Sequence, residues 1–421
     1  MIKYPFLFFF LCISSLSNNV SHQIKRSLLE NGFENIITAH DDENIFVAYE
    51  NRVFRYEPEA LLSVMKTIKE SIDISKKNSV FPSSLHNIVL IPLKRQIPVA
   101  AIEIPVNELE MFFNGRKNGS QFINSCEISF DVDYHWDKIK NIELENSGSY
   151  KLDLVVYPEI KTELDEFDDP WKLQFSFLPS IETTLGRGSL LKLQYNIPVV
   201  YRKFDVDKEV DAFRPGIMNF NQTVRVSNTY ISASFGFFTE YRYGADLEIR
   251  NYFFDGIFST GMNFGFTGES FYHNGGFEFT RLNETTYHFD AELRVPFYNL
   301  TFTTSYGQYI YEDEGYRVDL SRQLGEVSLG FFVSKSSSNQ LGSLTTGGFS
   351  FTVPLPFKKY SKINSIRVRP SENITYEYNA LHFIYFHQKK YKTGSDIKSF
   401  INNFQKDIII HYFNNINLTK K

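Results

Sequence analysis

From about residue 151 onward, the chain consists of strand-like stretches in which apolar and polar residues alternate, each followed by Gly, Asn, Asp or Ser. In the stretch from Arg242 to Phe253, Leu247 and its apolar neighbours fall on one face, whereas Glu248 and Arg250 fall on the other. The stretch 285–297 repeats the scheme. Full charges in the middle of a strand suit a face that borders water, so the pattern predicts a sheet with one apolar and one hydrated side.

The number and length of these stretches indicate which kind of sheet they form. They span residues 173–184, 190–201, 217–227, 230–239, 242–253, 257–267, 275–281, 285–297, 300–310, 316–322, 326–335 and 344–355, and 151–160 or 366–378 would add more. The best of them are longer than ordinary strands and long enough to cross a bilayer when tilted. Phe and Tyr number 42 and 25, and aromatics begin and end the apolar faces, as in interfacial girdles.

The sequence therefore predicts a mainly β protein, a transmembrane antiparallel β-barrel of about 12–14 strands over residues 149–378. A soluble β-sandwich also alternates and is the alternative. Residues 22–148 have mixed periodicity and predict a small α/β region, with strands at 35–39, 44–49, 87–92 and 97–104. Helices are expected near 28, from Pro58 to about 72, and over 106–113. Residues 379–421 form a C-terminal segment.

The first 21 residues resemble an export signal. Lys3 precedes an apolar core at 4–16, and cleavage is expected between Ser17 and Ser21. A membrane anchor and lipidation at Cys12 are the alternatives. The mature chain then keeps Cys126 alone, so no intrachain disulfide forms. The expected location is the Gram-negative outer membrane, with the N-terminal region in the periplasm.

The charged faces carry the candidate functional residues. Asp246, Glu248 and Arg250 form a triplet on one face, and Asp290, Glu292 and Arg294 repeat it. One interpretation is a hydrated wall that binds a polar polymer weakly, and the other is a salt-bridge lattice that holds the barrel in shape. The full set of predicted contacts with a polymer in the lumen is Lys192, Gln194, Asp246, Glu248, Arg250, His288, Asp290, Glu292 and Arg294.

No motif in the sequence indicates catalysis. A nucleophile motif that would recruit His288 is absent, and the histidines and cysteines lack zinc-ligand spacing. We therefore expect no enzyme activity, no catalytic residues, no cofactor and no metal. The net charge of −5 argues against nucleic acid as a partner.

Several short motifs, in order, resemble the YjbH-like family, outer-membrane proteins of exopolysaccharide export operons. They are Gly32-Phe33-Glu34-Asn35-Ile36, Phe46-Val47-Ala48-Tyr49-Glu50-Asn51-Arg52, Phe54-Arg55-Tyr56, Arg214-Pro215-Gly216, Phe220-Asn221-Gln222-Thr223, Gly236-Phe237-Phe238, Arg242-Tyr243-Gly244, Gly265-Phe266-Thr267-Gly268, Gly347-Gly348, Val353-Pro354-Leu355 and Arg367-Val368-Arg369-Pro370. The resemblance implies a role in secreting or assembling extracellular polysaccharide. The expected partners are outer-membrane lipid, the polysaccharide itself and periplasmic export or assembly proteins.

Two other functions remain open at this point. One is a structural outer-membrane component of another secretion or surface-attachment system, with a lumen plugged by the N-terminal or C-terminal segment. The other is a membrane-embedded enzyme that modifies glycan or lipid.

Overall fold

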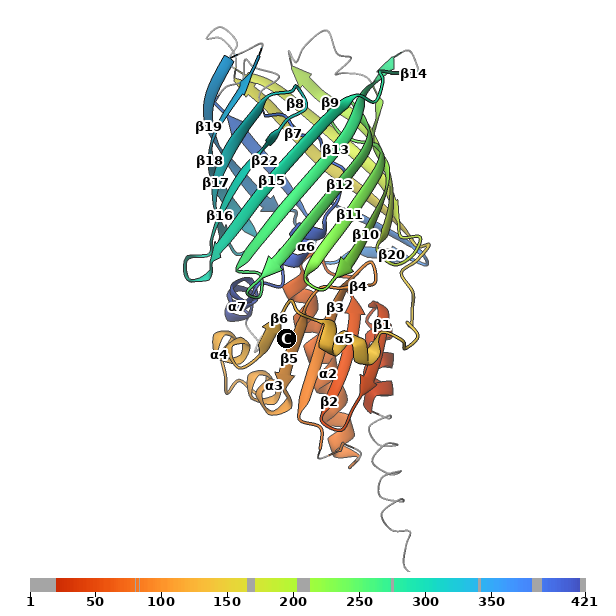
Figure 1. Cartoon of the computed structure of the whole chain (residues 1–421). Coiled ribbons are helices and arrows are strands. Elements are labelled where there is room, and N and C mark those ends of the chain that lie inside the picture. The colour runs from red at the N-terminus through yellow and green to blue at the C-terminus, as the bar shows by residue number, and fades with distance from the viewer. Residues whose placement is uncertain are drawn as a thin grey trace, which may run out of the picture. The chain divides into compact units, whose positions relative to one another are not determined.

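The computed structural model describes residues 20–79, 81–82, 84–164, 171–202, 213–273, 276–339, 342–380 and 388–416. It divides into two compact units, Met1–Gly148 with Ile397–Lys421, and Ser149–Asp396 (Figure 1). The stretch 379–421, expected as one C-terminal segment, is thus shared between the units. The expected signal peptide falls on residues 1–19, outside the described residues, and on Val20 and Ser21, which begin a helix over 20–30.

The first unit is an α/β fold around one mixed sheet in the order β1-β2-β3-β5-β6. Its strands are β1 (Glu34–His40), β2 (Asn44–Glu50), β3 (Asn87–Lys94), β4 (Ile97–Pro98), β5 (Ala101–Pro105) and β6 (Glu127–Ser129). Its helices, besides 20–30, are α2 (Glu57–Lys77), α3 (Val106–Phe113), α4 (Gly119–Asn124), α5 (Asp133–Ile139), α6 (Ile397–Asn402) and α7 (Lys406–Asn414). The strands predicted at 35–39, 44–49 and 87–92 and the helix at 106–113 agree with these elements. The strand predicted at 97–104 is instead divided into β4 and β5, and α2 continues past the expected end at about 72 to Lys77.

Helix α2 begins where the sequence indicates, because Pro58 occupies its first turn and Glu57 and Glu59 face the positive end of the helix dipole. Its apolar stripe is buried at Leu61, Met65 and Ile68. The helix connects β2 to β3, which pair in parallel.

The C-terminal helix α7 completes the first unit by packing on α4. Phe413 lies against Phe112 and Phe122, with ring centroids 5.6 and 6.1 Å away. The Asn414 side chain accepts hydrogen bonds from the backbone and hydroxyl of Ser120 at 2.7 and 2.9 Å. The C-terminal end of the described chain therefore packs into the same core as residues about 290 positions earlier in the sequence.

The second unit is dominated by a 16-stranded sheet. Its strands are β7 (Leu152–Leu164), β8 (Trp171–Thr183), β9 (Ser189–Arg202), β10 (Arg214–Val226), β11 (Thr229–Phe237), β12 (Arg242–Phe253), β13 (Phe258–His273), β14 (Gly276–Phe279), β15 (Glu284–Val295), β16 (Leu300–Gln308), β17 (Glu314–Leu324), β18 (Val327–Ser338), β19 (Gly342–Pro354), β20 (Ser361–Ile363), β21 (Ile366–Pro370) and β22 (Asn373–Asn379). Neighbours from β7 to β13, and from β15 to β19, follow one another as antiparallel pairs. The chain is therefore mainly β.

Two details differ from the sequence-based expectation. Residues 275–281, expected as a full strand, supply only the short β14. Strand β15 pairs with β13 as far as Thr267. Only β13 residues 270–273 therefore remain to pair with β14. The stretch 366–378 divides into β21 and β22, and the short β20 was not expected.

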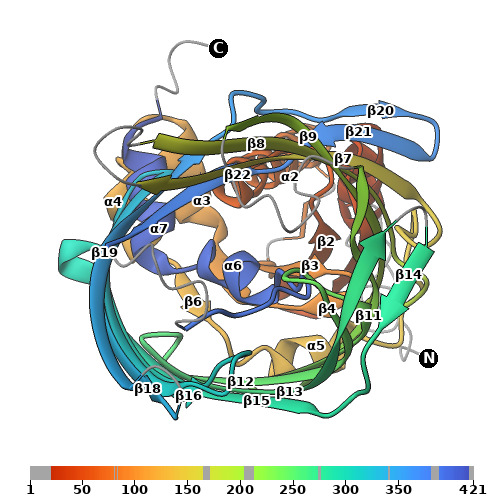
Figure 2. The same ribbon diagram turned by 90° about the horizontal axis from the view of Figure 1, so that it is seen from above.

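The two ends of the large sheet come together. Strand β21 pairs in parallel with β7, β22 pairs with β19, and only Ser371 and Glu372 separate β21 from β22. The Ser371 amide also donates to the carbonyl of Val156 in β7 at 2.9 Å. The sheet accordingly curves until β22 lies beside β7 (Figure 2).

None of the helices in the described part of the chain combines the length and apolarity needed to cross a bilayer.

Candidate functional site

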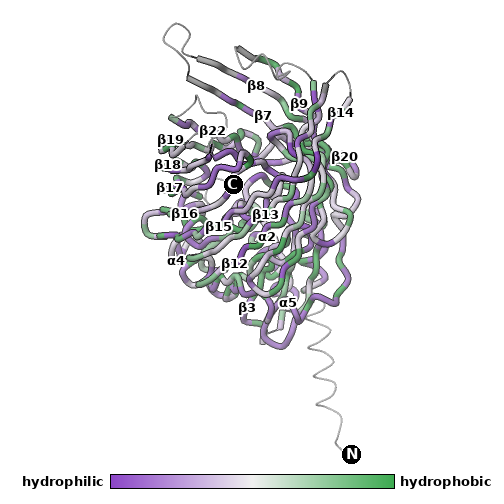
Figure 3. The backbone as a smooth tube through the Cα atoms, turned by 45° about the horizontal axis from the view of Figure 1, so that its top comes forward, coloured by the Kyte–Doolittle hydropathy of each residue, from purple (hydrophilic) through white to green (hydrophobic). Residues whose placement is uncertain are grey.

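Residue hydropathy alternates along strands of the large sheet (Figure 3), and since successive side chains of a strand point to opposite faces, the two faces differ in polarity. Leu247, Leu293 and Leu329 are 37%, 44% and 44% exposed. On the opposite face, Arg250 and Glu292 are 4% and 6% exposed. The polar side chains therefore line the inner face of the curved sheet, and the leucines project outward.

The two charged triplets meet across β13. Arg250 of β12 donates to both carboxylate oxygens of Asp290 in β15, at 2.7 and 2.8 Å. The register places Gly261 of β13 between them, and a side chain there would overlap both groups. Because Gly261 has no side chain, the Arg250 side chain can extend across β13 and reach Asp290 in β15. Glu248 lies 4.0 Å from Arg250.

We expect Gly261→Ala to break this pair. The methyl group would displace the guanidinium from the carboxylate, and charged hydrogen bonds of this kind contribute about 1.5–3 kcal/mol to stability. Urea unfolding of the purified chain in detergent measures the loss. Gly186→Ala, whose added methyl group meets no atom within 4 Å, is the control. An equal cost in an Arg250→Gln/Asp290→Asn background would contradict the explanation.

Asp246, the remaining member of the first triplet, has other partners. It accepts from the Asn263 amide at 3.0 Å and from the Tyr391 hydroxyl at 2.8 Å. His288 is buried and its ring packs edge-on against Tyr309, with centroids 5.0 Å apart. Glu292 and Arg294 are buried on the same inner face.

Lys192 and Gln194 belong to a different part of the inner face, on β9. Lys192 pairs with Glu182 of β8 at 3.0 Å and lies over the Tyr157 ring at 4.1 Å. The Gln194 side chain reaches the backbone of Ile217. The two strands β10 and β11 separate these residues from the triplets.

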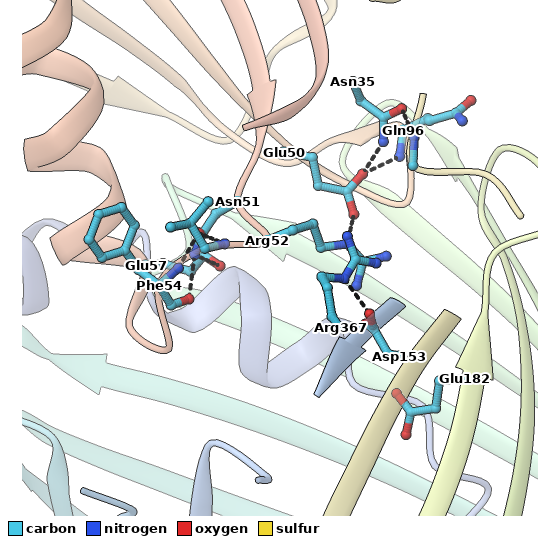
Figure 4. A network of polar contacts seen from close by, with 12 residues as sticks. Asn35, Glu50, Asn51, Arg52, Phe54, Glu57, Gln96, Asp153, Glu182 and Arg367 are labelled. Carbon is cyan, nitrogen blue, oxygen red and sulfur yellow. Dashed lines mark hydrogen bonds and ion pairs between the residues drawn. The ribbon is translucent and has the colours of Figure 1, made fainter. Parts of the chain in front are cut away.

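Glu182 belongs to an ion network that sequence reasoning did not identify. Asp153 of β7 pairs with Arg367 of β21, and both side chains are almost fully buried (Figure 4). Arg369 lies 3.7 Å from Asp153 and 3.5 Å from Glu182. The network spans the junction of β21, β7 and β8, where the sheet begins. We call it the seam network. Its one sequence signal is the pair of arginines in Arg367-Val368-Arg369-Pro370.

A second buried polar cluster lies in the first unit and is built from the Glu34-Asn35 and Glu50-Asn51-Arg52 motifs (Figure 4). Glu50 accepts from the Asn35 amide at 2.6 Å and from the Gln96 backbone at 3.1 Å, and it pairs with Arg52 at 3.2 Å. Asn51 caps the following turn through Phe54. These residues connect three segments of the unit, which is a structural reason for the motif.

Asn35 also has a backbone φ of 51° and accepts from the Gly148 amide at 2.9 Å. Asn35→Ala should destabilise the first unit by about 1–3 kcal/mol, because Glu50 and the Gly148 amide lose a buried partner. Hydrogen exchange of β1 and β2 in the full chain reports the change. Glycine adopts the left-handed backbone without strain. Asn35→Gly should therefore lose only the stability that the side-chain hydrogen bonds contribute, and less in total than Asn35→Ala. Unchanged exchange in both variants would refute the role.

Residues 388–396 line part of the inner face. The sequence left open a lumen plugged by the C-terminal segment but did not single out these residues. Tyr391 stacks on Phe238, with centroids 5.2 Å apart, and its hydroxyl lies 3.4 Å from that of Thr286. Asn219 donates to the carbonyl of Thr393 at 2.6 Å. We call Gln388–Asp396 the inner strap.

Within the described residues, no group of His, Cys, Asp and Glu side chains is arranged to hold a metal ion. The inner face offers hydroxyl, amide and charged groups of both signs. Such groups can bind a hydroxyl-rich ligand through several weak hydrogen bonds.

Comparisons with known proteins give one family match. The family model YjbH, described as exopolysaccharide biosynthesis protein YbjH, matches residues 14–368. No curated protein is significantly similar in sequence. One similar solved structure is a loop L8 deletion mutant of OmpT, an outer membrane protein of Vibrio cholerae, with 9% identity and a TM-score of 0.29. That match covers 55% of this chain and 93% of the other.

Proposed function

Because the chain belongs to the YjbH family of exopolysaccharide biosynthesis proteins, we propose that it is an outer-membrane β-barrel protein in the secretion or assembly of an extracellular polysaccharide. The polar inner face of the large sheet contacts the polymer. The first unit lies in the periplasm and meets export or assembly proteins.

The observation that carries this proposal is the contrast between the two faces. Strands of 12 residues such as β12 and β15 are long enough to cross a bilayer when tilted. Their outward leucines are exposed, and their charges are buried or half-buried on the inner face. An apolar outside around a polar inside is the arrangement of outer-membrane barrels. The approach of β22 to β7 supports closure of the sheet, which a bilayer requires of strands.

Polymer transport requires contacts that form and release easily. Mixed charges, amides and hydroxyls on one wall provide many such contacts, none of them dominant. No catalytic group is part of this mechanism, so the protein acts by binding and guiding.

A structural role in another secretion or attachment system is the second candidate. The Arg250–Asp290 ion pair favours it. Two charged groups that bind each other stabilise the wall and have fewer hydrogen-bonding positions available for a ligand. The presence of the inner strap against the wall also fits a plugged scaffold.

The deciding experiment neutralises both triplets together. The substitutions are Asp246→Asn, Glu248→Gln, Arg250→Gln, Asp290→Asn, Glu292→Gln and Arg294→Gln. Arg250 and Asp290 are removed together, so that neither member of this ion pair is left behind alone. We expect surface polysaccharide, normalised to folded protein in the outer membrane, to fall partly for single changes and further for the full set.

The control is Lys69→Gln/Asp73→Asn, which neutralises an ion pair within α2 of the first unit. Normalised output at the wild-type level after loss of both triplets would reject polymer contact and leave the scaffold role. Protein that fractionates with the cytosol would reject the proposed location.

A further inference from the structure

The inner strap comes after β22 in the sequence and lies against the polar inner face of the second unit. At its start, the Gln388 backbone N–H donates to the Asp313 carboxylate at 2.9 Å, and Lys389 pairs with Glu240 at 3.6 Å. Both partners lie in turns, Asp313 just before β17 and Glu240 between β11 and β12. The strap is therefore tied to turns at one end of the sheet.

The middle of the strap contacts the polar inner face of the sheet through Tyr391. The Tyr391 hydroxyl donates to Asp246, four residues into β12 from the Arg242 end. A side chain at Gly265 of β13 would overlap this hydroxyl, so glycine provides the space for the tyrosine. The stacked Phe238 ring holds the other side of it.

Lys392 still lies beside the β11–β12 turn, and the residues after it reach deeper positions. Lys392 exchanges hydrogen bonds with Thr239, at 2.8 and 3.2 Å. Asn219, in the middle of β10, binds the carbonyl of Thr393, and Gly394 lies against Lys192 and Ile217. Lys192 is only three residues from the opposite end of β9. The contacts of Gln388, Thr393 and Gly394 thus place the strap along the inner face, from one end of the strands toward the other.

The wall groups bound by the strap include Asn219, Asp246 and Thr286, and the strap meets them with hydroxyl and carbonyl oxygens. A sugar polymer offers hydroxyl and ether oxygens, which bind the same amides, hydroxyls and carboxylates. Each such hydrogen bond is worth only about 0.5–1.5 kcal/mol net, so a polymer that makes several of them can replace the strap step by step.

We infer that the inner strap is an autoinhibitory occupant of the polymer site. It holds the interior closed at rest, and a hydroxyl-rich polysaccharide opens the path by taking over the strap's partners. This inference rests on the proposed membrane barrel and names the residues at which ligand and strap compete.

The inference is tested in the full chain by variants that release the strap and by a variant that locks it in place. Gly265→Ala removes the space for Tyr391 and should release the strap, so the purified protein in a planar bilayer should conduct more than the wild type. Tyr391→Phe keeps the stacking on Phe238, loses both hydroxyl contacts and should show a smaller increase. Gly186→Ala is the control and should conduct as the wild type does.

The opposite change locks the strap. Thr239→Cys/Lys392→Cys places two cysteines at residues whose backbones are hydrogen-bonded, from the Thr239 N–H to the Lys392 carbonyl at 3.2 Å, for oxidation to a disulfide. The thiol of Cys126 does not interfere, because burial raises its pKa to about 12. Oxidised cells should lose surface polysaccharide, and a reductant should restore it, whereas Lys392→Cys alone should respond to neither.

Equal polymer output from the oxidised and reduced lock would overturn the inference, as would wild-type conductance of Gly265→Ala. Failure of the proposed function looks different. If cells lacking this chain export polymer normally while Gly265→Ala still raises conductance, the strap closes a barrel of another function.

Discussion

Asp153→Asn should lower the stability of the second unit by about 3–5 kcal/mol, because the buried Arg367 loses the charged carboxylate with which it pairs. The Asp153 and Arg367 side chains are 3% and 2% exposed, so water cannot replace the lost carboxylate. Arg369 loses the same partner. Since the pair joins β7 to β21 at the point where the sheet meets its own end, we expect the folded fraction to fall as well.

The measurement is the proportion of unheated protein that migrates as the folded species on a detergent gel, followed by urea unfolding of that species. Glu159→Gln on the same strand is the matched control, because its pair with Lys161 is longer, 3.8 Å, and more exposed. Such pairs contribute about 0–1 kcal/mol. A folded fraction and urea midpoint equal to wild type would show that the seam network does not hold the sheet ends together.

Leu247→Arg should cost about 2–4 kcal/mol in a bilayer, because the charge would face lipid near the midplane. Leu247 lies in the middle of β12 and projects outward. Leu293 projects outward too but lies near the end of β15, so Leu293→Arg should cost less. Glu248→Gln on the inner face is the control and should be better tolerated.

This prediction separates the membrane barrel from a soluble sheet. On an exposed soluble face, the same arginine would change stability by no more than about 0.5 kcal/mol. Unfolding in lipid bilayers gives the free energies. Absence of a difference between Leu247→Arg and Leu293→Arg, or labelling of Leu247→Cys by a membrane-impermeant reagent, would contradict the assigned orientation.

The charged wall shows how far sequence pattern extends toward a site. Alternation along one strand correctly separates Leu247 from Glu248 and Arg250, because side-chain direction in a strand depends only on position. It does not indicate which residue of another strand lies opposite. The Arg250–Asp290 pair depends on the register of three strands and on Gly261 between them. Lys192 and Gln194, grouped with the triplets from sequence, instead lie beside Glu182 and Ile217.

The sequence by itself determined the local elements: the long alternating strands, the polarity of their faces, and helices such as α2 that carry their own start residues and apolar stripe. These follow from interactions between residues close in the chain. Only the tertiary structure decided the seam between Asp153 and Arg367, the packing of α7 on α4, and the position of the inner strap. Each of these contacts joins segments that are far apart in the sequence. Their stabilisation comes from burial and from pairing in three dimensions, and neither produces a periodic pattern in the sequence.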